Sequence, residues 1–125
     1  MKKTKIILVA IVSLILGGCS GSDTYRGNWK ATNEEGAQLD IVFGENDFSI
    51  TENGKTENFE YSQNSVSTEN SIETYGITLD DGRSFQIHFP IGNDESKGAI
   101  LDANSRPLYI ISRSAYIGYK DVYGL

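Results

Sequence analysis

The sequence predicts an all-β fold, in which an antiparallel meander of eight or nine short strands closes into a small barrel. An N-terminal signal helix precedes the barrel in the chain. Three observations carry this prediction. From residue 25 onward, apolar and polar residues alternate in short segments, as in strands with one buried face. Gly, Asn and Asp separate these segments at hairpin spacing. Apolar positions also match across the turns, which favours a barrel. A two-sheet sandwich is the alternative.

The first 18 residues are organised as a secretion signal. Lys2, Lys3 and Lys5 form a positive start, and an apolar run of eleven residues, broken by one serine, extends from Ile6 to Leu16. As a helix this run would be roughly 16 Å long, about half the thickness of a bilayer's hydrocarbon core. The sequence therefore predicts a signal peptide over residues 1–18 and not a transmembrane span.

The signal ends in Leu16-Gly17-Gly18-Cys19, which resembles a bacterial lipobox. The resemblance implies that a diacylglycerol is attached to the sulfur of Cys19 and that cleavage leaves this cysteine first. It predicts a lipid-anchored protein on the extracytoplasmic face of the cell membrane, with no free thiol because Cys19 is the only cysteine. An ordinary cleaved signal with an incidental cysteine is the alternative.

The charge of the mature chain restricts its partners. Cleavage before Cys19 leaves 107 residues with 8 basic and 17 acidic side chains, a net charge of −9 against −6 for the whole chain. Such an acidic surface argues against nucleic-acid binding, because no basic patch can displace phosphate counterions. Residues 19–24 form a short linker, residues 25–113 the predicted barrel and residues 114–125 an aromatic tail.

Five turns define the meander through the parity of the apolar residues around them. Three-residue loops are expected at residues 34–36 and 80–82, four-residue loops at 44–47 and 103–106, and a type I′ turn at Asn53-Gly54. The predicted apolar pairs are Ala31 with Leu39, Trp29 with Ile41, Phe43 with Phe48, Ile41 with Ile50, Phe48 with Phe59, Ile77 with Phe85, Tyr75 with Ile87, Leu101 with Leu108 and Ala99 with Ile110. Residues 62–71 are polar, and form either a long loop or an irregular strand.

The same parity predicts the interior. The residues expected to face it are Trp29, Ala31, Leu39, Ile41, Phe43, Phe48, Ile50, Phe59, Tyr61, Tyr75, Ile77, Leu79, Phe85, Ile87, Phe89, Leu101, Leu108 and Ile110.

The tail contains the candidate interaction residues. Tyr116, Tyr119 and Tyr123 recur at helical spacing, although Gly118 and Gly124 weaken a helix. The alternatives are a short helix that plugs one barrel end, a final strand, or a docking segment. Three tyrosines in so short a segment suit a protein interface, and covering the open barrel end is the other interpretation.

Gly27 and Trp29 enter the first expected strand and resemble the Gly-x-Trp start of lipocalin-like proteins. In that family the tryptophan packs across the barrel floor against a basic residue from a late strand, and Arg113 is the candidate for that part. The resemblance implies a lipocalin-like barrel.

Patterns of catalytic and metal-binding residues are missing from the sequence. His88, the only histidine, falls on the polar face of its expected strand and is interpreted as exposed. Paired acids lie beside turn glycines, where turn chemistry explains them, and glycoside hydrolysis needs carboxyls that face each other. Asp102-Ala-Asn104 resembles the start of a calcium loop but lacks its glycine and distal glutamate. We therefore expect no enzymatic activity, no cofactor and no metal.

Two functions fit these expectations. The first is a non-catalytic binding or accessory role in which the anchored domain contacts an envelope or extracellular protein. The second is a lipocalin-like carrier of a small apolar ligand, which requires an interior cavity of about 300 Å³ or more. The large inward side chains Trp29, Phe43, Phe59 and Phe85 argue for a filled interior and against the carrier.

Overall fold

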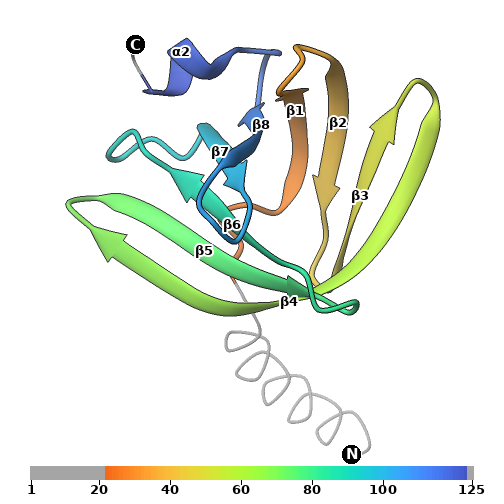
Figure 1. The fold of residues 1–125 in the computed structure, drawn as a ribbon. Helices are drawn as coiled ribbons and strands as arrows, with labels where there is room; N and C mark the ends of the chain where they lie inside the picture. Colours follow the sequence, from red (N-terminus) through yellow and green to blue (C-terminus); the bar gives the residue numbers. More distant parts are fainter. Residues whose placement is uncertain (1–21, 124–125) are drawn as a thin grey trace, which may run out of the picture.

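A computed structural model describes residues 22–123, which form a closed antiparallel barrel (Figure 1). Its eight strands are β1 (Gly27–Asn33), β2 (Gln38–Phe43), β3 (Asp47–Glu52), β4 (Lys55–Glu69), β5 (Ile72–Leu79), β6 (Ser84–Phe89), β7 (Lys97–Leu101) and β8 (Pro107–Ser112). Each strand pairs with the next, and β1 pairs with β8 to close the ring. The predicted barrel is therefore confirmed over the sandwich. The signal segment lies outside the described residues.

Four of the five predicted turns have the expected register. All apolar pairs predicted across them are present, from Ala31 opposite Leu39 to Tyr75 opposite Ile87. The turn at Asn53 has positive φ at both central residues, 54° and 77°, as a type I′ turn requires. Alternation is informative in these strands because each has one apolar face.

The polar segment 62–71 continues β4 and forms a turn. The second half of β4 pairs with β5 after a register shift between Gln63 and Ser65. Asn70 and Ser71 both have positive φ, 53° and 67°, and connect the two strands. Because β3 pairs only with the first half of β4, the far part of this hairpin extends past the barrel wall, as Figure 1 shows in green.

One end of the barrel is closed by a floor made from Tyr25, Trp29 and Arg113. Trp29 is 1% exposed, and the Cζ atom of Arg113 lies 3.7 Å from its ring centroid. The guanidinium also donates hydrogen bonds to three backbone carbonyls between Thr24 and Asn28, at 2.7 to 3.0 Å. The indole N–H of Trp29 donates to the carbonyl of Tyr25 at 2.8 Å. The contact expected between Arg113 and Trp29 is therefore present.

The inward and outward faces of β7 and β8 are the reverse of the prediction. Ala99 lies opposite Ile110 as expected, but this pair belongs to a cluster outside the wall. The inward residues are Ile100 and Ile111, which pack with the main core. Both faces of these strands are apolar, so alternation carries no information about direction.

The turn after β7 also differs from the prediction. A register shift at the end of β7 places Leu101 opposite Pro107 and not opposite Leu108. Leu101 is buried in the outer cluster, whereas Leu108 reaches the open end of the barrel.

The tail explains why the outer face of β7 and β8 is apolar. After Arg113 the chain leads to α2 (Tyr119–Tyr123), a five-residue helix on the outside of the barrel (Figure 1). An outer cluster joins the tail to the wall and contains Ala99, Leu101, Ile110, Ile117, Val122 and Tyr123. The short helix is thus present, but it covers the side of the barrel and does not plug its end. Within residues 22–123 we find no helix long and apolar enough to cross a membrane.

Candidate functional site

The barrel contains a cavity of about 360 Å³ that opens at the end opposite the floor. The lining side chains come from β2 to β8 and the turn before β6: Ile41, Phe43, Phe48, Ile50, Glu52, Glu57, Phe59, Ile77, Leu79, Arg83, Phe85, Ile100, Leu108 and Tyr109. Glu52, Glu57, Arg83 and Leu108 lie next to the turns and form what we call the mouth. The cavity is therefore a cup with an apolar wall and a charged rim.

Aromatic rings form much of the cavity wall. Phe48 stacks on Phe59 with a centroid distance of 5.1 Å, and its ring also lies 5.1 Å from that of Phe43. These mutual contacts hold the rings against the strands. The lower part of the interior is filled, as expected, since Ile41, Phe43 and Ile77 are at most 2% exposed, whereas Phe59 and Phe85 are only partly buried and line the open part of the cavity.

Arg83 spans the mouth and is already paired. Its Cζ atom lies 5.6 Å from the ring centroid of Phe59 and 5.8 Å from that of Phe85. Its Nη2 atom lies 2.8 Å from the carboxylate of Asp81, and its Nε–H donates to both oxygens of the same group. The Asp81 carboxylate therefore occupies the outer side of the guanidinium.

Two further carboxylates reach the mouth from the β3–β4 hairpin. Burial raises the pKa of the Tyr109 hydroxyl, the carboxylates of Glu52 and Glu57 raise it further, and Arg83 lowers it. Sequence reasoning missed these residues, although a signal was available. The alternation that points Phe48 into the barrel also points Glu52 inward, four residues further along the strand.

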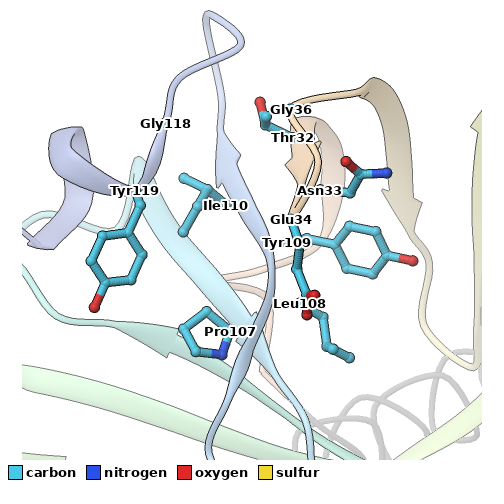
Figure 2. A pocket seen from close by; sticks show the side chains of 10 residues that line it. All are labelled: Thr32, Asn33, Glu34, Gly36, Pro107, Leu108, Tyr109, Ile110, Gly118 and Tyr119. Carbon is cyan, nitrogen blue, oxygen red and sulfur yellow. The ribbon is translucent and has the colours of Figure 1, made fainter.

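A second hollow of about 400 Å³ lies outside the barrel, between β8, the turn after β1 and the tail (Figure 2). Tyr119 forms one side, Pro107 and Ile110 lie beside it, and Glu34 stands across the hollow. Tyr119 is 45% exposed and stacks on Tyr123 with a centroid distance of 4.6 Å. The structure thus brings two of the three candidate tyrosines together.

Tyr116 lies apart from the other two tyrosines. Its hydroxyl donates to Asp40 at 2.6 Å, and the Lys30 ammonium lies 5.0 Å from its ring centroid. Both partners are on β1 and β2, so Tyr116 fixes the start of the tail against the outside of the barrel.

The remaining candidates have structural roles. His88 is half-buried and not exposed, with its Nδ1 atom 2.8 Å from the Thr74 hydroxyl, and burial lowers its pKa. The Asp102 carboxylate accepts backbone N–H groups of Asn104 and Arg106 at 2.8 and 2.9 Å, which assigns it to a turn. Over residues 22–123, no group of three or more His, Cys, Asp or Glu side chains could hold a metal ion. Cys19, the predicted lipid attachment site, lies outside the described residues.

Comparison of the chain with protein-family models, with curated proteins and with solved structures gives no match. The cavity and the hollow beside the tail are therefore interpreted from their own geometry.

Proposed function

We propose that this protein is a lipid-anchored, non-catalytic binding protein of the cell envelope whose barrel takes up a small apolar ligand. The cavity carries this proposal: its volume of about 360 Å³ lies within the range of ligand pockets, its wall is apolar, and it is open at one end. The resemblance of Gly27 and Trp29 to lipocalin-like proteins supports the same use. The extracytoplasmic location rests on the signal sequence and the lipobox.

An anchor at Cys19 would hold the mouth away from the bilayer. Ser22, three residues after Cys19, donates its backbone N–H to Gln63 at 2.9 Å, and the hydroxyl of Tyr25 in the floor donates to the same side-chain oxygen. Three residues span at most about 10 Å, so the floor would lie close to the membrane. Ligand exchange would then take place on the aqueous side.

Methyl NMR of the full chain in lipid nanodiscs tests cavity binding directly. Titration with octanol is expected to shift the isoleucine methyl signals of Ile50 and Ile100, which line the cavity. The signal of Ile117, which packs against the outer cluster and lines neither hollow, should stay in place and serve as an internal control for alcohol dissolved in the lipid. Equal shifts at inner and outer positions, or none at either, would refute the proposal.

A variant that fills the cavity provides the matched control. Ile50 is only partly buried, so Ile50→Trp can place its larger ring in the free space with limited strain. This variant should keep the dispersed spectrum of a folded barrel and lose the octanol-dependent shifts. Retention of these shifts would place the alcohol elsewhere.

Contact with an envelope or extracellular protein is the second candidate function, and the hollow beside Tyr119 is the observation that favours it. Deleting the tail is a poor test, because it would uncover the outer cluster. Tyr119→Ala removes an exposed ring and leaves the buried Val122 in place. Crosslinking to envelope proteins should weaken in this variant and not in Lys120→Ala on the same helix. Equal recovery from both variants would contradict a role for Tyr119.

A further inference from the structure

We infer that the cavity selects ligands with a positively charged end, such as alkyl or aryl amines, with the apolar part inside the barrel and the ammonium group at Glu52 and Glu57. The inference deepens the proposed binding function and rests on it. It follows from the distribution of charge around the mouth, because the apolar wall alone does not distinguish between ligand head groups.

The two glutamates are the unpaired charges of the cavity lining. Both line the cavity, on the two strands of one hairpin, with Glu57 directly opposite Ile50. Within residues 22–123 neither carboxylate lies within 4.0 Å of a basic side chain. A ligand ammonium group could therefore bind these two carboxylates without breaking an existing ion pair.

The two nearby cations, Arg83 and Lys55, form no ion pair with Glu52 or Glu57 within residues 22–123. Arg83 is held by Asp81, which meets it at 2.8 Å, so the pair has no net charge. Lys55 lies opposite Glu52 in the strand register and lines a second hollow together with Glu52 and Glu57, but it does not line the cavity, and among the described residues it is within 4.0 Å of neither carboxylate. A ligand carboxylate would meet Glu52 and Glu57 while the guanidinium is already engaged.

The charges at the mouth also act on the pKa of the Tyr109 hydroxyl in the cavity wall. Beyond the effect of burial, Glu52 and Glu57 each raise the pKa of this hydroxyl by more than Arg83 lowers it. The negative potential at the mouth thus reaches the cavity lining. The net charge of −9 on the mature chain acts in the same direction at longer range.

A series of ligands with one alkyl chain and three head groups tests the inference. Octylamine, octanol and octanoate differ in charge at neutral pH, and the shifts of the Ile50 and Ile100 methyl signals give a dissociation constant for each in the full chain in nanodiscs. We expect octylamine to bind about fivefold more tightly than octanol, and octanoate to bind more weakly than octanol, since exposed ion pairs contribute modestly.

Charge-matched variants separate the mouth from the overall charge. The double variant Glu52→Gln and Glu57→Gln should reduce the ratio of amine to alcohol affinity to about one. The double variant Glu60→Gln and Glu69→Gln removes two charges that do not line the cavity and should keep the preference. Because the ratios are compared between proteins in the same nanodiscs, partition of the ligands into lipid cancels.

The outcomes distinguish this inference from the function on which it rests. If neither octanol nor octylamine shifts the cavity methyl signals, the proposed binding function fails. If octanol binds and octylamine binds no more tightly, or if the preference survives in the Glu52 and Glu57 double variant, charge selection is overturned and the binding function stands.

Discussion

Replacing Arg113 with alanine is expected to cost about 3 to 4 kcal/mol of the free energy of unfolding. The guanidinium donates three hydrogen bonds to backbone carbonyls at 2.7 to 3.0 Å and lies 3.7 Å from the centroid of Trp29. Each hydrogen bond from a charged donor contributes about 1 kcal/mol or more, and the cation–π contact about 0.5 to 1 kcal/mol. Small domains have a total stability of about 5 to 15 kcal/mol, so this loss is large.

Urea unfolding followed by the fluorescence of Trp29, the only tryptophan, measures this loss at the site where it occurs. Arg113→Lys keeps the charge but cannot reach three carbonyls in one plane, so it should fall between wild type and alanine. Arg83→Ala is the matched control: its side chain is 55% exposed, and it should change stability by less than about 1 kcal/mol. A similar small loss in Arg113→Ala would refute the view that the guanidinium holds the floor together.

Three other substitutions probe the start of β1, the tail and the half-buried histidine. Gly27→Ala should cost about 2 kcal/mol or more of the free energy of unfolding, because φ is +100° and a Cβ would lie 3.2 Å from the guanidinium of Arg113. Gly54→Ala, where φ is +77° and the space around the residue is open, should cost less. Equal losses of the two variants in urea unfolding would contradict this reasoning. Val122→Ala should cost about 1 to 2 kcal/mol because it opens the outer cluster, whereas Val66→Ala, 58% exposed in wild type, should stay within about 0.5 kcal/mol by the same assay. Burial lowers the pKa of His88 in the folded state. As the pH falls below the ordinary histidine pKa of about 6.5, the unfolded chain therefore binds more protons than the folded chain. The free energy of unfolding decreases over this pH range. His88→Gln should reduce this pH dependence, and identical slopes of stability against pH in the two proteins would contradict the assignment.

The sequence predicts the first six strands well, for a physical reason. Each strand has an apolar face and a polar face, so only the correct turn length places apolar residues opposite each other, as Trp29 lies opposite Ile41. A turn of another length would place an apolar residue opposite a polar one. The polar stretch after Tyr61 gives no such contrast, and its turn at Asn70 and Ser71 lacks glycine. The sequence of this stretch therefore does not distinguish a long loop from an irregular strand.

The face of β7 and β8 could not be predicted from those strands alone. Ile110 and Ile111 are adjacent and both buried, one under the tail and one in the barrel. Only the position of α2 decides which of the two is outside, and a five-residue helix with Gly118 before it has little sequence signal. The charged mouth could have been predicted from the sequence, because the alternation that points Phe48 inward also points Glu52 inward. The cavity volume could not have been predicted, since it depends on how the aromatic rings pack.

The seam between β1 and β8 gives the fold a required order of assembly. Lys30 lies opposite Ser112, and Arg113 bonds to the carbonyl of Thr24, 89 residues earlier in the chain. Hairpins from β1 to β7 can form from local contacts, but they make an open sheet with a bare edge until β8 arrives. The ring can therefore close only after the residues up to Ser112 have left the ribosome. A chain shortened before β8 would keep both its sheet edge and its apolar interior exposed to other chains.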